Sequence, residues 1–376
     1  MMLPRRGLLL ASGLAGLGPA SAAGPEQALA FAGPEALEAA AQAALPAPVH
    51  DWIAGGAGAE TTQRRNREAL TAATVTPRLL TGAGPAELGL TLLGQLLPHP
   101  VLVAPMGLQG LAHPRGELAA AAGAAAAGAL FMAAMVATHG LEAIAAAAEQ
   151  AAPGAPRWFQ MYVPRDRGIA LDLARRAAAA GYGALVLTLD APVGAWRERN
   201  LGHGFTLPAA LGSGNDRPEY PHRLLGGTDA DLTWADVEWL RARAGLPLVL
   251  KGILAPRDAI RAIEAGAAAI IVSSHGGRQF DGAPASLAVL PRIVEAVAGR
   301  LPVLLDSGPR RGLDVLKALA AGATAVAIGR PVWWGLALGG GAGVRSVLER
   351  IVAELAIAMR LAGCGSLAEV TPDLLA

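Results

Sequence analysis

Eight short apolar runs recur between residues 101 and 328, and each is followed by a segment of helical length. The runs cover residues 101–104, 129–135, 158–163, 184–189, 247–251, 268–273, 302–306 and 325–328. Continuous apolar strands that alternate with helices indicate a parallel sheet covered on both faces. Eight such units predict an α/β fold closed into a TIM (β/α)8 barrel. A doubly wound open sheet is the alternative, although no Gly-x-Gly-x-x-Gly motif follows an early strand.

The regions around these runs suggest the domain organisation. Residues 24–100 are interpreted as an N-terminal helical lead-in, with a helix at 34–44 and an irregular stretch at 71–100. Residues 101–376 form the predicted barrel. Residues 191–232 show no strong periodicity and are rich in Gly, Pro and polar side chains. Since this segment follows the fourth strand, we expect a lid on the face where barrel active sites lie.

The first residues have the pattern of an export signal. Arg5 and Arg6 precede an apolar run at 8–17, and small residues follow at 19–24. A charged start, an apolar centre and a small-residue cleavage site define a signal peptide, and paired arginines suggest the twin-arginine type. Residues 1–23 therefore predict export of a folded protein to the periplasm, with a cytoplasmic protein as the alternative. The apolar run is too short to span a bilayer, so no stable membrane span is expected.

Charge and cysteine content exclude several classes of function. The net charge is +1, which gives no basic field for nucleic acid. The single cysteine, Cys364, excludes an intrachain disulfide framework and a cysteine-cluster metal site. The seven histidines show no metal-ligand spacing, so no metal site is predicted.

The sixth apolar run leads into a polar loop that carries His275 and Arg278. An imidazole can accept a proton near neutral pH. A guanidinium can hold a carboxylate through two parallel hydrogen bonds. Together they suit a small acid that loses a proton near its carboxylate. A surface turn with solvated side chains is the alternative reading of this loop.

Polar residues also follow the other strands, and in a barrel such strand ends converge on one mouth. Gly308 with Arg310 after the seventh run, and Gly329 with Arg330 after the eighth, suit a phosphate group. Lys251 ends the fifth run and needs an anionic partner. It either forms an ion pair across the barrel or stabilises negative charge on a reduced cofactor ring.

Several motifs, in this order and spacing, give the chain a family resemblance from about residue 45 to the C-terminus. They are Ser-Ser-His-Gly-Gly-Arg-Gln at 273–279, Leu-Lys-Gly at 250–252, Asp-Ser-Gly-Pro-Arg-Arg-Gly at 306–312, Ile-Gly-Arg-Pro at 328–331, Phe-Gln-Met-Tyr at 159–162 and Leu-Ala-His-Pro at 111–114. The chain resembles the FMN-dependent α-hydroxy-acid oxidases and dehydrogenases, which include glycolate oxidase, lactate oxidase and mandelate dehydrogenase.

The resemblance implies oxidation of an (S)-2-hydroxy acid to a 2-oxo acid with FMN. Electrons would leave to O2 or to a quinone or cytochrome, and the protein would be a homo-oligomer, by resemblance a tetramer. His275 would remove a proton from the α-carbon or the hydroxyl, with Asp190 orienting the imidazole. Arg278 and Arg197 would hold the substrate carboxylate, and Tyr162 would hydrogen-bond the substrate. The implied cofactor contacts are Pro105, Met106, Gly107, Gln160, Thr188, Lys251, Ser273, Asp306, Ser307, Gly308, Arg310, Gly329 and Arg330.

Three sites depart from the family pattern, and one of them is the Pro-Thr-Ala turn of many relatives, which appears here as Pro105, Met106 and Gly107. Trp52 stands where the family usually carries a substrate-binding tyrosine, and an indole donates a hydrogen bond but accepts none. Ala134 stands where a hydroxyl residue is common. Three other functions stay open: a flavin barrel retuned to a peptide or an amine, of which Trp52 would be the mark, a non-catalytic flavin-binding protein, and a phosphosugar-binding barrel without flavin.

Overall fold

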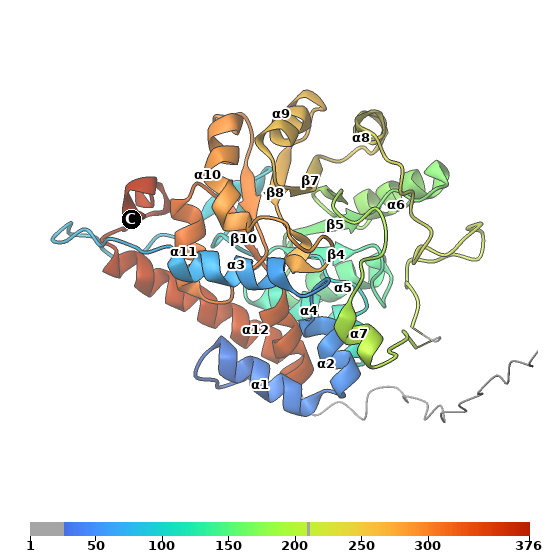
Figure 1. Ribbon diagram of the computed structural model, residues 1–376, viewed down its shortest axis with the longest axis horizontal. Helices are drawn as coiled ribbons and strands as arrows, with labels where there is room; N and C mark the ends of the chain where they lie inside the picture. Colours follow the sequence, from blue (N-terminus) through green and yellow to red (C-terminus); the bar gives the residue numbers. More distant parts are fainter. Residues whose placement is uncertain (1–25, 209–210) are drawn as a thin grey trace, which may run out of the picture.

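Eight parallel strands close into a barrel in the computed structural model, which describes residues 26–208 and 211–376 (Figure 1). The strands are β3 (Val101–Val103), β4 (Phe131–Ala134), β5 (Arg157–Met161), β6 (Leu185–Thr188), β7 (Leu248–Ile253), β8 (Ala269–Val272), β9 (Val303–Leu305) and β10 (Ala325–Ile328). Each begins and ends within two residues of its predicted run. β10 pairs with β3 and closes the ring, so the TIM barrel is confirmed and the open sheet is wrong.

The strands are apolar throughout because both of their faces are buried. In β8, Ile271 belongs to the cluster that fills the barrel, and its neighbour Ile270 packs into the outer core beneath the helices. Both side chains are 0% exposed. Period-2 alternation places successive side chains on opposite faces, and here neither face meets water.

Helices surround the barrel and connect successive strands (Figure 1). Those of the barrel are α4 (Gly116–Ala126), α5 (Leu141–Ala151), α6 (Arg167–Ala179), α8 (Trp234–Arg243), α9 (Pro256–Glu264), α10 (Ser286–Val297), α11 (Gly312–Ala320) and α12 (Arg330–Leu361). α12 is bent at Gly339 and Gly340, where the backbone leaves the helical region. Within the part of the chain that the structure describes, no helix is sufficiently long and apolar to span a membrane.

From residue 26 onward, where the structure describes it, the N-terminal lead-in contains three helices, α1 (Pro34–Ala44), α2 (Ala47–Ala54) and α3 (Thr61–Ala72). α1 confirms the helix predicted at 34–44. α3 packs against the loop after β8, where a Cβ on Gly277 would meet the Gln63 backbone nitrogen at 2.5 Å. The lead-in therefore covers the end of the barrel at which the strands finish.

A hairpin closes the opposite end of the barrel. It consists of β1 (Leu90–Leu92) and β2 (Gln95–Leu97), in the stretch predicted to be irregular. Leu92 and Leu97 join the cluster inside the barrel, and Trp158 Nε1 donates to Gln95 Oε1 at 2.7 Å. Three-residue strands carry too little periodicity for sequence patterns to identify them.

The segment predicted as a lid connects β6 to α8 and contains the short helix α7 (Glu198–Gly202). Its Leu207 and Leu225 side chains line the main cavity. Arg199 of α7 contacts Glu60 Oε2 at 2.6 Å, so the segment is attached to the N-terminal lead-in.

Candidate active site

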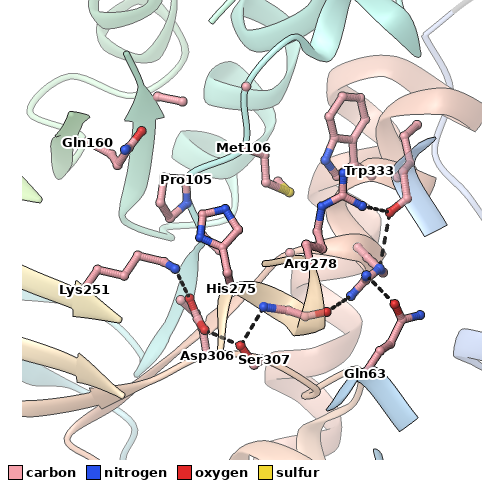
Figure 2. Close-up of a pocket in the computed structure, with 18 of the residues that line it drawn as sticks. Gln63, Pro105, Met106, Gln160, Lys251, His275, Arg278, Asp306, Ser307 and Trp333 are labelled. Carbon is pink, nitrogen blue, oxygen red and sulfur yellow. Dashed lines mark hydrogen bonds and ion pairs between the residues drawn. The ribbon is translucent and has the colours of Figure 1, made fainter. Parts of the chain in front are cut away.

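A cavity of about 340 Å³ lies at the ends of the barrel strands and gathers most of the predicted site residues (Figure 2). Those that line it are Trp52, Pro105, Met106, Gly107, Gln160, Tyr162, Arg197, Lys251, His275, Arg278, Asp306, Ser307, Gly308, Arg310, Gly329 and Arg330. Positions 52 and 330 are far apart in sequence, and both reach the cavity because helix α2 of the lead-in packs at the barrel end where the loop after β10 leaves.

Three predicted residues do not line the cavity and instead support side chains that do. Thr188 Oγ1 accepts a hydrogen bond from Gln160 Nε2 at 2.9 Å. Ser273 Oγ accepts from Lys251 Nζ at 2.8 Å. The third residue, Asp190, contacts the His275 imidazole. The structure thus places the hydroxyls of Thr188 and Ser273 behind the cavity wall, where they orient its polar groups.

His275 is fixed in both backbone and side chain. Its φ of +55° lies in the left-handed region, which costs a non-glycine residue about 1–3 kcal/mol and is common at functional sites. Nδ1 lies 2.8 Å from Asp190 Oδ1. Among the described residues Nε2 has no hydrogen-bond partner, so this nitrogen is available to a molecule in the cavity. Burial opposes ionisation of Asp190, but Lys251 and His275 outweigh burial and hold the pKa of Asp190 below its usual value.

Three half-buried arginines line the cavity, and the described residues give them no carboxylate partner. Within residues 26–208 and 211–376, no ion pair joins Arg197, Arg278 or Arg330 to an acidic side chain. Arg278 Nη1 donates to the backbone oxygens of Ile53 and Gly55, at 3.0 and 2.8 Å. Burial and the charges of its two neighbouring arginines lower the pKa of Arg278 well below its usual value. Uncompensated guanidinium groups favour the binding of anions in this cavity.

Lys251 occupies another part of the wall and is charged. Its Nζ lies 3.2 Å from Asp306 Oδ2, and both residues are at most 5% exposed. Burial opposes the charge, but Asp306 and Asp190 raise the pKa of Lys251. The predicted ion pair across the barrel is present, and Figure 2 shows it beside Ser307. A charged lysine here can also stabilise negative charge on a ligand.

The loop after β9 approaches the lead-in closely. Gly308 has φ +115°, and a Cβ there would lie 2.9 Å from Leu70 Cδ1 and 3.0 Å from Asn66 O. The hydroxyl of Ser307 accepts hydrogen bonds from the backbone N–H groups of Ser274 and Gly276, at 3.1 and 2.9 Å. These contacts fix the β9 loop relative to the loop that carries His275.

Tyr162 presents a protonated phenol to the cavity. Burial, followed by the charge of Asp190, raises the pKa of Tyr162 to about 12. At neutral pH the side chain is therefore a neutral hydrogen-bond donor.

Sequence reasoning missed other residues of the cavity wall, including Gln63, Asn66, Arg67 and Trp333. Trp333 packs edge to face with Trp52, with ring centroids 6.0 Å apart, and Arg278 Cζ lies 5.2 Å from the Trp52 ring. Trp333 follows the Gly-Arg-Pro motif closely, which was an available signal. The polar helix α3 gave no comparable signal, because its contact with the mouth is tertiary.

Three comparisons with known proteins point to the same group of flavin enzymes. Residues 41–376 match the model of a family described as FMN-dependent dehydrogenase. The chain is 47% identical to L-lactate oxidase of Nostoc sp. over 338 residues, covering 86% of this chain and 92% of the relative. It is 41% identical to glycolate oxidase 1 of Oryza sativa subsp. indica, covering 89% and 92%. A solved mandelate oxidase variant with a C4a-OH-FMN adduct is 43% identical, with TM-score 0.83, covering 90% and 97%.

Proposed function

The chain belongs to the FMN-dependent dehydrogenase family, and from that premise we propose that it oxidises an (S)-2-hydroxy acid to a 2-oxo acid. Its relatives are named as oxidases of lactate, glycolate and mandelate, all of which are 2-hydroxy acids. The observation that carries the proposal is that one cavity brings together His275 Nε2, Arg197 and Arg278, and that the described residues give Nε2 no hydrogen-bond partner and neither arginine an acidic partner.

The cavity suits FMN in its charge distribution. Lys251 is a buried cation in one part of the wall, and Arg310 with the glycine loop at Gly308 is suited to a phosphate in another. Arg330 is half-buried, and its desolvation together with the charge of Arg310 lowers the pKa of Arg330 to about 10. A phosphate would relieve that repulsion. When bound, FMN supplies the acceptor for the two electrons of the oxidation.

The protein's own groups hold the substrate and move a proton. Arg197 and Arg278 bind the substrate carboxylate, which compensates their half-buried charges. The Tyr162 phenol donates a hydrogen bond to the substrate. His275 accepts the proton at Nε2, since Nδ1 is held by Asp190. The Asp190 carboxylate stabilises the imidazolium that forms.

The test is anaerobic mixing of the yellow protein with glycolate, lactate and mandelate while flavin absorbance is followed. Bleaching by at least one of them is expected, and His275→Ala should abolish it. If FMN is bound and none of the three bleaches it, the retuned flavin barrel replaces this proposal. If His275→Ala bleaches normally, His275 is not the base. A colourless protein that does not take up FMN would favour the phosphosugar barrel.

The proposal extends to three further properties of the enzyme. The electrons pass to O2 or to a quinone or cytochrome, the protein assembles as a tetramer, and Trp52 affects the size of substrate that fits. We propose that Trp52 narrows or reshapes the substrate end of the cavity relative to a tyrosine. Oxygen consumption with matched peroxide formation would distinguish O2 from a quinone or cytochrome as acceptor. Sedimentation analysis would test the tetramer.

The export signal predicted at residues 1–23 remains part of the proposal, and it lies outside the described residues. Replacing Arg5 and Arg6 together by lysine should keep the protein out of the periplasm if the signal is of the twin-arginine type. Unchanged periplasmic yield would contradict that assignment.

A further inference from the structure

Helix α1 places two glutamates, one turn apart, against two consecutive arginines of the β9–α11 loop. Glu38 Oε2 lies 2.5 Å from Arg310 Nη1, and the Glu35 carboxylate oxygens lie 2.9 and 3.1 Å from Arg311 Nη2. The helix is anchored by Leu37, which is 1% exposed. The two pairs differ in one respect, because Arg310 lines the cavity and Arg311 does not.

Arg310 makes one hydrogen bond through its backbone and one through its guanidinium group, and the other guanidinium N–H groups are free of the described residues. Its backbone N–H donates to Asp314 Oδ2 at 2.8 Å, and Nη1 is taken by Glu38. Among the described residues, Nε and Nη2 donate to no protein acceptor. The pair with Glu38 is half-buried, with side chains 17% and 27% exposed. The guanidinium is therefore oriented by Glu38 with N–H groups still available to a ligand in the cavity.

Arg330 is the other arginine expected at the phosphate, but most of its N–H groups already donate to protein acceptors. Its N–H groups donate to backbone oxygens of Ile53, Gly55 and Gly276, and Nη2 also donates to Gln63 Oε1 at 2.8 Å (Figure 2). It contributes charge to this part of the cavity but few free donors. Arg310 is thus the better placed of the two to hydrogen-bond an anion directly.

We propose that Glu38 is a positioning residue for FMN: it fixes the Arg310 guanidinium so that the remaining N–H groups bind the cofactor phosphate. The inference depends on the proposed role of FMN and deepens it, because it assigns a function to the N-terminal helix α1. An oriented fork binds phosphate better than a freely rotating side chain, since less side-chain entropy is lost on binding. The opposite possibility is that the Glu38 carboxylate competes with the phosphate for Arg310.

The experiment measures the rate at which flavin is released after the holoenzyme is diluted. The recovery of flavin fluorescence reports the release. Each protein is loaded either with FMN or with riboflavin, which lacks the phosphate. For Glu38→Gln we expect FMN release to be about tenfold faster, the effect of losing one oriented charged hydrogen bond, and riboflavin release to be unchanged. The matched control is Glu35→Gln, which makes the same change one turn away and should alter neither rate.

Other outcomes overturn the inference. Slower FMN release from Glu38→Gln would mean that Glu38 competes with the phosphate. Equal acceleration for FMN and riboflavin would mean that the variant only loosens α1. Arg310→Lys provides a second arm, because adding Glu38→Gln to it should cause no further acceleration if Glu38 acts through Arg310. A wild-type protein that binds neither flavin would instead contradict the proposed function itself.

Discussion

The contact between Asp190 and His275 yields the most direct test of the chemistry. Replacing Asp190 by Asn keeps the shape of the side chain and removes its charge. With charge centres about 4 Å apart and an effective dielectric constant of about 20, a carboxylate stabilises an imidazolium by about 4 kcal/mol. The imidazole is 22% exposed and the carboxylate 14% exposed, so solvent screens part of this interaction. Retaining about half of it leaves about 2 kcal/mol, or a roughly 30-fold effect on rate.

The assay is anaerobic stopped-flow reduction of bound FMN by an excess of the best substrate. We expect Asp190→Asn to slow this step by about 30-fold or more. The rate of FMN release should be unchanged, because Asp190 does not line the cavity. Lys251 keeps Asp306 as a partner in the variant, so its environment is largely preserved.

Asp166→Asn is the matched control, since Asp166 caps helix α6 through a 2.7 Å hydrogen bond from Gly168 N, away from the cavity. It should leave flavin reduction unchanged. If FMN in the Asp190→Asn variant is reduced at a rate within about threefold of wild type, that rate refutes the argument. The charge interaction between Asp190 and His275 would then contribute under about 1 kcal/mol. The lowered pKa of Asp190 also predicts how the stability of the fold depends on pH. The stabilisation from ionised Asp190 is present above about pH 4 and is lost as the pH falls through its folded pKa.

Three further predictions concern stability and titration. The pKa of each of the three tyrosines is raised, to about 12 for Tyr162 and Tyr220 and further for Tyr182, with burial as the largest cause. A spectrophotometric titration should therefore show little phenolate near pH 10, where a free tyrosine is half ionised, and the midpoint should fall to about 10 in denaturant. The three tyrosines stabilise the fold fully below about pH 10 and lose this contribution as the pH rises through their folded pKa values. Lys251→Met leaves Asp306 buried and unpaired, and should lower the free energy of unfolding by about 3–5 kcal/mol in denaturant titrations. Adding Asp306→Asn should recover part of the loss, and no recovery would show that the ion pair is not its source. Gly308→Ala combines a φ of +115° with close contacts to α3 and should destabilise by about 2–4 kcal/mol. Gly226→Ala, at φ +84° with no atom within 4 Å of a Cβ, should cost only about 1 kcal/mol, and equal costs would contradict the packing argument.

Much of the fold followed from local patterns in the sequence. The eight apolar runs predicted the barrel because a strand buried on both faces must be apolar at every position. The helix at 34–44 followed from its Ala-rich, proline-started pattern, and the structure places α1 at Pro34–Ala44. The hairpin β1–β2 was not predicted, since its strands are too short for periodicity and its role depends on the barrel end that it covers.

The chemical residues were also visible in the sequence, through their positions at the strand ends and the family resemblance. His275, Arg278, Lys251 and Arg310 line one cavity as expected. Their partners were less accessible to such reasoning. Glu38 lies 272 residues from Arg310 in the sequence, and no pattern connects the two.

The sequence by itself determined the eight strands of the barrel and the polar side chains that stand at their ends. Both are properties of short windows, in which periodicity and residue type are sufficient. Only the tertiary structure decided which charges are compensated. Arg278 and Arg330 donate to the carbonyls that end α2, Lys251 is paired with Asp306, and Arg310 is paired with Glu38. Charge compensation depends on distance in space, and the closure of the barrel with its N-terminal lead-in sets those distances.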